Sequence, residues 1–116
     1  MILCNEWKEA EETIEVSYKL LEDWGETYQA QVSISNNSET EINCWKLGFN
    51  LTGSISEIWD SVLLSEENGT VIVSNNETNS TIAPENKANF SFIAKKNKDE
   101  TPELSDFILY ENYINI

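Results

Sequence analysis

Trp45-Lys46-Leu47-Gly48-Phe49-Asn50-Leu51 carries an apolar side chain at every second position. Successive side chains of a strand point to opposite faces, so this alternation predicts a strand with one buried face. We therefore expect Trp45 in the hydrophobic core and assign it no further role. The same stretch indicates that the fold is built from strands.

Similar alternation recurs at residues 14–20, 28–34 and 88–92. Polar turn sequences separate these stretches, and Asn68-Gly69 is the strongest hairpin signal among them. About seven to nine short strands with little helical periodicity predict an all-β fold, an antiparallel β-sandwich of the Greek-key or immunoglobulin-like type.

The 116 residues are enough for one domain with one core. We expect residues 14–116 to form the sandwich and residues 1–13 to form a leader or a short helix. The chain has two cysteines, Cys4 and Cys44, and no histidine, so a metal site is not expected and no cofactor is predicted. The cysteines can form one disulfide or remain free thiols, and their spacing does not decide between the two.

The charge balance excludes several classes of partner. There are 21 acidic side chains against seven lysines, which gives a net charge of −14. Nucleic acids and anionic membrane surfaces are bound by cationic proteins, so neither is an expected partner. No apolar run approaches the roughly 18 residues of a membrane span. A neutral ligand meets no such repulsion, although the acidity can also serve solubility alone.

Trp24 and Trp59 lie where strands give way to turns, beside Gly25 and Asp60 respectively. An exposed flat aromatic side chain often has a ligand to lie against, so both are candidates for binding a polysaccharide. The alternative is that they cap the ends of the sandwich, as aromatic side chains often do.

Residues 24–32 (Trp-Gly-Glu-Thr-Tyr-Gln-Ala-Gln-Val) and 42–49 (Ile-Asn-Cys-Trp-Lys-Leu-Gly-Phe) are the longest of six ordered motifs. The others are residues 36–38, 58–61, 79–84 and 89–92. In this order and at this spacing they resemble the family 2 carbohydrate-binding modules, the cellulose- and xylan-binding domains of bacterial polysaccharide-degrading enzymes.

The resemblance implies a planar row of three aromatic side chains that lies along a sugar chain. Trp24 and Trp59 match two members of that row, and Thr78 stands at the third. The missing aromatic side chain predicts a weaker binder, or one for a less flat glycan such as a hemicellulose. Gln31, Glu57 and Asn79 lie near the row in sequence and are the predicted hydrogen-bond partners of the sugar hydroxyls.

The resemblance further implies a non-catalytic module that binds a plant-cell-wall-type β-glycan, cellulose or hemicellulose. Such a module would be extracellular and part of a larger secreted or surface protein. Without histidine the chain has no ordinary serine or cysteine triad, so we expect no enzyme activity. The alternative is a structural or adhesive sandwich module with a protein partner.

Overall fold

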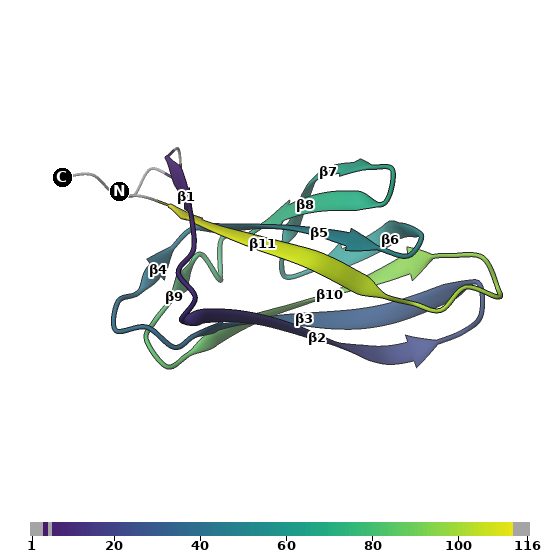
Figure 1. Ribbon diagram of the computed structural model, residues 1–116, viewed down its shortest axis with the longest axis horizontal. Coiled ribbons are helices and arrows are strands. Elements are labelled where there is room, and N and C mark those ends of the chain that lie inside the picture. Colours follow the sequence, from purple (N-terminus) through teal and green to yellow (C-terminus); the bar gives the residue numbers. More distant parts are fainter. Residues whose placement is uncertain (1–3, 5, 113–116) are drawn as a thin grey trace.

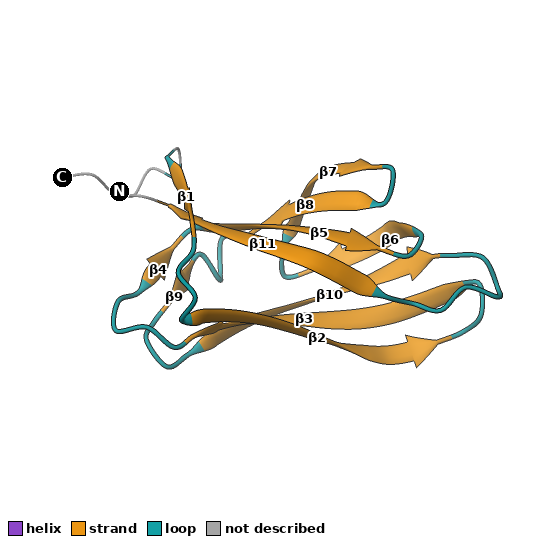
Figure 2. Ribbon diagram, in the orientation of Figure 1, coloured by secondary structure: helices purple, strands orange, loops and turns teal. Residues whose placement is uncertain are grey.

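The computed structural model describes residues 4 and 6–112, and within them eleven strands form and no helix (Figure 2). This part of the chain accordingly holds no helix of the length and hydropathy needed to cross a membrane. The strands are β1 (Trp7–Glu9), β2 (Ile14–Asp23), β3 (Thr27–Asn36), β4 (Ile42–Asn43), β5 (Trp45–Leu51), β6 (Ser54–Trp59), β7 (Val62–Glu67), β8 (Thr70–Ser74), β9 (Thr81–Ile82), β10 (Lys87–Lys95) and β11 (Leu104–Asn112).

Two antiparallel sheets face each other and form a sandwich (Figure 1). One has five strands in the order β1-β11-β5-β8-β7, and the other has four in the order β2-β3-β10-β6. The short strands β4 and β9 pair at one end. The predicted all-β sandwich is thus confirmed, with more strands than expected because several are only two or three residues long.

The core lies between the sheets and is made by alternating residues of β3, β5, β8 and β10. Trp45, Phe49 and Phe90 are at its centre, with the Trp45 and Phe90 rings stacked at 5.9 Å. Trp45 is fully buried, as its sequence setting predicts. Its indole Nε1–H donates a hydrogen bond to the backbone carbonyl of Asn79 at 3.0 Å, which satisfies the one polar group of the side chain.

Two strands lie in segments without regular alternation. Residues 7–9, within the stretch for which a leader or short helix was expected, form β1 and pair with β11 at the edge of the five-stranded sheet. The rest of that stretch is described only in part, since residues 1–3 and 5 lie outside the described residues, as do residues 113–116. Residues 54–59, which carry no regular alternation, form β6 beside β10.

The two cysteines form a disulfide, with Cα atoms 5.9 Å apart. It joins the N-terminal segment to Cys44, the residue between β4 and β5. Of the two states that the sequence allows, the structure therefore has the disulfide rather than the free thiols.

We expect Trp45→Phe to destabilise the protein by about 2 kcal/mol, because it leaves a cavity beside Phe90 and an unsatisfied carbonyl on Asn79. Urea unfolding followed by circular dichroism measures this change. Trp59→Phe, at an exposed position, is the control and should alter the free energy of unfolding by less than about 0.5 kcal/mol. Equal effects of the two substitutions would contradict the central role of Trp45.

Replacing both Cys4 and Cys44 by serine should lower the free energy of unfolding by about 3–4 kcal/mol. The disulfide closes a loop with a sequence separation of 40, and its loss restores conformational entropy to the unfolded chain. Urea unfolding of the oxidised protein and of the double variant gives the difference. A loss below about 1 kcal/mol would mean that the unfolded state is already compact around this loop.

Candidate functional site

Trp24 and Trp59 lie on the outer face of the four-stranded sheet. Trp59 ends β6 and pairs with Ser91 of β10, whose neighbours in the strand, Phe90 and Phe92, point into the core. Trp24 follows Asp23, which pairs with the buried Tyr28, so strand alternation directs Trp24 outward. The two residues are 54% and 42% exposed, respectively, so neither is a core residue.

The strand register gives the offset between these two residues. Trp24 directly follows β2 and Trp59 ends β6, and these strands are at opposite edges of the sheet. Trp24 lies opposite Thr27 and Trp59 lies in the row of Gln31, so their positions along β3 differ by the separation of Thr27 and Gln31. With about 4.8 Å between strands and about 3.3 Å per residue, the offset is roughly 20 Å. A ligand that contacts both must therefore be several sugar units long.

A buried lysine holds the turn that carries Trp24. The Lys96 side chain is almost fully buried, and its ammonium group donates hydrogen bonds to the carbonyls of Gly25 and Asn97. It also lies 3.4 Å from the Asp23 carboxylate. Gly25 has a φ of 93°, a conformation that favours glycine, and its N–H donates to Asp23 at 2.9 Å. The buried Lys96 ammonium group and the Asp23 carboxylate therefore fix the conformation of the turn.

The contacts within this turn lower the pKa of the Asp23 carboxyl group. The hydrogen bond from the Gly25 backbone N–H, and then the charge of Lys96, lower the pKa of Asp23 below its ordinary value of 3.8. Asp23 therefore stays ionised at any pH above this value and keeps its two partners.

Lys96 was not identified from the sequence, although a signal for it exists. The inward positions of β10 are Ala88, Phe90, Phe92 and Ala94, and continuing the same alternation by two residues reaches Lys96. A lysine that continues the inward-facing positions of a strand is buried, and its charge then needs partners. Here backbone carbonyls and the Asp23 carboxylate are those partners.

Asn79 ties the loop after β8 to the end of β6. Its side-chain nitrogen donates to the carbonyl of Asp60 at 2.6 Å, and its side-chain oxygen accepts from the Asn76 N–H at 2.8 Å. Thr78 is held in the same loop, since its hydroxyl donates to the Asn76 side chain at 2.8 Å. Asn79 thus positions the residue next to Trp59, and its predicted contact with a ligand, through the remaining N–H, stays a prediction.

Gln31 and Glu57 lie on the same outer face as the two tryptophans. Gln31 is half-buried on β3 and shares a row with Ser91 and Trp59. Glu57 is exposed on β6 and pairs with Ile93. Four of the five predicted site residues are therefore together on one sheet face, and Asn79 lies in the loop at its edge.

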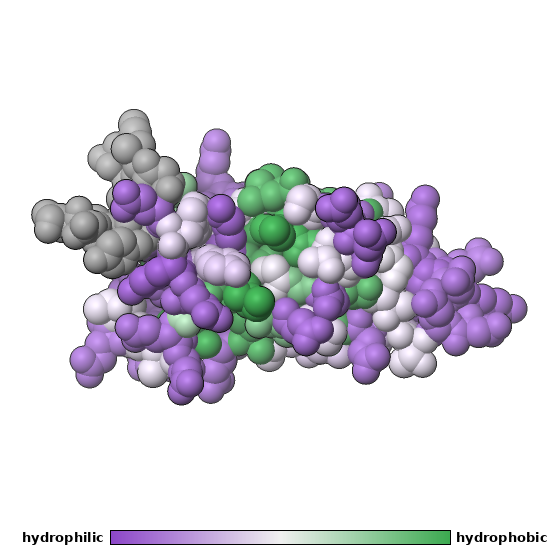
Figure 3. All heavy atoms as spheres, turned by 45° about the horizontal axis from the view of Figure 1, so that its top comes forward, coloured by the Kyte–Doolittle hydropathy of each residue, from purple (hydrophilic) through white to green (hydrophobic). Residues whose placement is uncertain are grey.

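The outer face of the five-stranded sheet is different in character. Exposed aliphatic side chains gather on it, at Ile72, Ile108, Val62 and Leu64, and Figure 3 shows this apolar area with that side of the molecule turned forward. Ile72 and Ile108 both pair with Gly48, which leaves a gap between them. Aliphatic side chains offer no flat π face to a sugar ring, and the aromatic residue Tyr110 on this sheet is 37% exposed, less than either Trp24 or Trp59.

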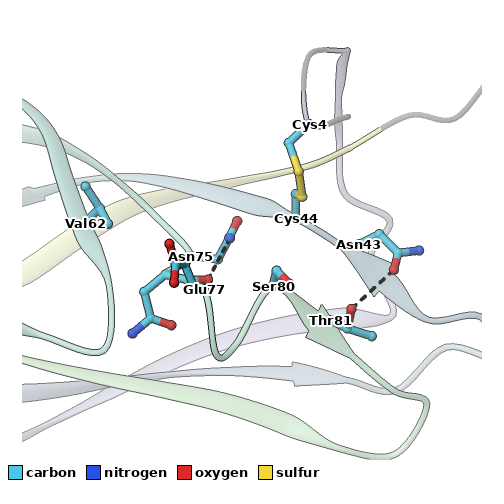
Figure 4. A pocket seen from close by; sticks show the side chains of 9 residues that line it. Cys4, Asn43, Cys44, Val62, Asn75, Glu77, Ser80 and Thr81 are labelled. Carbon is cyan, nitrogen blue, oxygen red and sulfur yellow. Dashed lines mark hydrogen bonds between the residues drawn. A yellow bond between two sulfur atoms is a disulfide. The ribbon is translucent and has the colours of Figure 1, made fainter. Parts of the chain in front are cut away.

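A hollow of about 660 Å³ lies beside the disulfide (Figure 4). Its lining includes Cys4, Cys44, Asn43, Asn75 and Thr81, and none of the predicted site residues. None of the described residues that line it has an aromatic side chain on which a sugar ring could stack. Within the described residues, no group of three or more Cys, Asp or Glu side chains is arranged to hold a metal ion.

The fold agrees with a comparison to known families. The model of the cellulose binding domain family matches residues 14–108, most of the chain. The chain belongs to this family. The resemblance indicated by the sequence motifs is thereby confirmed, and this family member is a carbohydrate-binding module.

Solved structures show the same fold. A chitinase from Bacillus thuringiensis matches with a TM-score of 0.65 and 26% identity over 78% of this chain, but over only 15% of the chitinase. The cellulose-binding family 2 domain of ScLPMO10C matches with a TM-score of 0.61 and 23% identity, covering 87% of this chain and 97% of that domain. The chitin-binding domain of Chi18aC from Streptomyces coelicolor matches with a TM-score of 0.61 and 19% identity, covering 80% and 90%. Among curated proteins no sequence matches.

Lys96→Met should lower the free energy of unfolding by about 1–3 kcal/mol, because it leaves the carbonyls of Gly25 and Asn97 without their charged donor. It should also speed amide hydrogen exchange at Gly25, which reports directly on the turn. Lys95→Met is the matched control, since Lys95 is the exposed neighbour on the outer face. If both variants behaved alike, the turn would not depend on the buried ammonium group.

The acid titration of Asp23 tests the same turn. Because the folded-state pKa of Asp23 lies below its ordinary value, its stabilising contacts persist above pH 3.8 and are lost as the pH falls through the folded pKa. An NMR titration of the Asp23 carboxyl should show a midpoint below 3.8 in the wild-type protein and a higher one in Lys96→Met. An unchanged midpoint in the variant would exclude Lys96 as a cause of the shift.

Proposed function

We propose that this carbohydrate-binding module binds a plant-cell-wall-type β-glycan, cellulose or hemicellulose, along the outer face of its four-stranded sheet. Trp24 and Trp59 are the stacking platforms. The observation that carries the proposal is that both tryptophans are exposed on one sheet face. The other two are engaged elsewhere, Trp45 in the core and Trp7 beneath the Lys46 ammonium group.

The chemistry of a sugar ring suits these platforms. A pyranose has C–H groups on its faces and hydroxyls around its rim, and an indole laid on the face removes apolar area of both partners from water. Burying about 100 Å² on each tryptophan contributes ~2.5 kcal/mol at ~25 cal/mol/Å². Two platforms give ~5 kcal/mol, which corresponds to a Kd on the order of 10⁻⁴ M before other terms are counted.

The side chains around the platforms are suited to the rim hydroxyls. Gln31 offers an amide in the row of Trp59, and Glu57 offers a carboxylate one position away from it on the same face. Amide and carboxylate oxygens accept hydrogen bonds from hydroxyls, and the amide nitrogen donates them. We assign Asn79 a contact through its second N–H, besides its role in the loop.

Thr78 favours a weak binder, or one for a less flat glycan. An aromatic side chain at this position would add a third platform, and its absence forgoes roughly 1–3 kcal/mol, by analogy with stacking on bases. On a flat crystalline surface a full row of aromatic side chains can stack at once, so a missing member weakens binding. A soluble hemicellulose chain can bend to stack on two tryptophans. Among the plant glycans we therefore favour a hemicellulose.

We further propose that the module is a non-catalytic part of a longer extracellular protein and keeps an attached enzyme or surface protein at its glycan. A match that covers only 15% of a chitinase supports the longer protein, and the disulfide is typical of oxidising compartments. Incubation with labelled polysaccharides tests the absence of catalysis, and release of short products would overturn it.

Chitin is the second candidate ligand. The chitinase that matches at 26% identity favours it, as do chitin-binding domains of the same fold. Chitin presents the same kind of flat ring face to the tryptophans and adds acetamido groups, so discrimination rests with the polar side chains around them.

Affinity electrophoresis through gels that contain hydroxyethylcellulose, xylan or glycol chitin tests the function and ranks the ligands. Trp24→Ala and Trp59→Ala should each weaken binding about 30-fold or more, from the loss of ~2–2.5 kcal/mol of stacking, with thermal stability unchanged. Tyr110→Ala is the matched control, because Tyr110 is an exposed aromatic residue on the opposite sheet.

Two results would contradict the proposal. If Tyr110→Ala lost as much affinity as the tryptophan variants, the binding face would be wrong. If the wild-type protein were not retarded by any of the glycans, the alternative of a structural or adhesive module with a protein partner would be favoured.

A further inference from the structure

A second, polar feature lies on the tryptophan-bearing face. It is a hollow of about 320 Å³ over β2, β3 and β10, and no carboxylate lines it. Besides Tyr18, its lining consists of two lysines and a group of neutral polar side chains: Lys19, Lys87, Ser17, Gln31, Ser33 and Asn89. We refer to it as the lysine hollow.

The two lysines approach the hollow from opposite sides. Ser17, Ser33 and Asn89 form its central row across three strands. Lys19 lies in the row of Gln31 on one side, and Lys87 lies in the row of Ser35 on the other. Both side chains are long and exposed, so their ammonium groups can converge over the central row.

Neither lysine is neutralised by the protein. The ion pairs among the described residues join Lys8 to Glu111 and Lys96 to Asp23, and none involves Lys19 or Lys87. This is unexpected in a chain with three acidic side chains for every lysine. The nearest acidic residues in the register are Glu15, which is separated from Lys87 by Ser35, and Glu22, which pairs with Gln29 one outward row away from Lys19.

The neutral side chains of the hollow add hydrogen-bond donors. The Asn89 side-chain oxygen already accepts a hydrogen bond from the Ser33 hydroxyl, so the Asn89 amide N–H groups remain to donate. The Ser17 hydroxyl and the Gln31 amide are further donors at the edge. Two ammonium groups and several N–H and O–H donors are the partners that a carboxylate needs.

We infer that the lysine hollow binds the carboxylate of an acidic sugar that branches from a neutral glycan backbone. The inference rests on the proposed function, since the backbone would lie on Trp24 and Trp59. The centre of the hollow, at Ser33 on β3, is two strands away from Trp59 on β6. It is also displaced along β3 by the separation of Gln31 and Ser33. Together the two displacements correspond to roughly 12 Å. A branch of one or two sugar units spans such a distance.

The net charge of the protein decides which anion is suitable. At −14 the molecule repels polyanions and multiply charged groups such as phosphate esters, and this long-range repulsion grows with the charge of the ligand. A single carboxylate on a mostly neutral polymer meets the least repulsion and still pairs with both lysines. A uronic acid branch on a hemicellulose has this chemistry.

A xylan with glucuronic acid branches, and the same xylan after its carboxyl groups are reduced to alcohols, form the test pair. By isothermal titration at low salt, the wild-type protein should bind the acidic xylan about three- to tenfold more tightly than the reduced one. Lys19→Gln/Lys87→Gln should abolish this preference and leave binding of the reduced xylan unchanged. Lys46→Gln, on the opposite sheet, is the matched control and should keep the preference.

Two further measurements sharpen the test. Added salt should remove the preference, because exposed ion pairs are screened. Glu15→Gln should strengthen binding of the acidic xylan only, since it removes a nearby negative charge that repels the carboxylate. Equal or weaker binding of the acidic xylan by the wild-type protein would overturn the inference, as would a preference that survives in the double lysine variant.

The failure of this inference is distinguishable from failure of the proposed function. Equal binding of both xylans that is lost in Trp24→Ala and Trp59→Ala would disprove the lysine hollow as a carboxylate site and leave the tryptophan face intact. If neither xylan, nor any other glycan, bound to the protein, the proposed function and the inference would fall together.

Discussion

Trp45 connects the hydrophobic core to the edge of the candidate binding face. Its ring stacks on Phe90 between the sheets, and its Nε1–H donates to the carbonyl of Asn79. The Asn79 side chain in turn donates to the carbonyl of Asp60, the residue after Trp59. The end of β6 is thus fixed by a short series of hydrogen bonds that begins in the core. Exposed platforms can contribute to affinity only if their support is rigid, because ordering them on binding would cost entropy.

Trp24 has a support of a different kind. The Lys96 ammonium group is buried beneath the turn, where it replaces its hydration shell with backbone carbonyls and the Asp23 carboxylate. Such a group is stable only with all of its partners in place, which fixes the turn. The two tryptophans are therefore held by independent devices, a neutral hydrogen-bond series at one edge of the sheet and a charged cluster at the other.

The two outer faces of the sandwich differ in a way that suits one ligand surface. The four-stranded sheet presents two indoles among short polar side chains, and the lysine hollow keeps part of this face free of negative charge. The five-stranded sheet presents aliphatic side chains around Gly48. On the first of these faces a hydroxyl-rich polymer finds two exposed indoles with an amide and a carboxylate beside Trp59.

The sequence by itself determined the strands, the position of Trp45 in the core and the family of the fold. These follow from alternation with a period of two and from ordered local motifs, both of which are properties of neighbouring residues. It also singled out Trp24 and Trp59, because both lie where strands give way to turns and both match positions of the family's aromatic row.

Only the tertiary structure decided which distant residues meet. Strand register brings Gln31 into the row of Trp59, pairs Cys4 with Cys44 and sets Lys19 and Lys87 around one hollow. The tertiary structure also places the Lys96 ammonium group against the turn that carries Trp24, where it contacts Gly25 and Asp23. Alternation within a strand determines which of its faces is buried, whereas which distant strands become neighbours depends on how the whole chain packs.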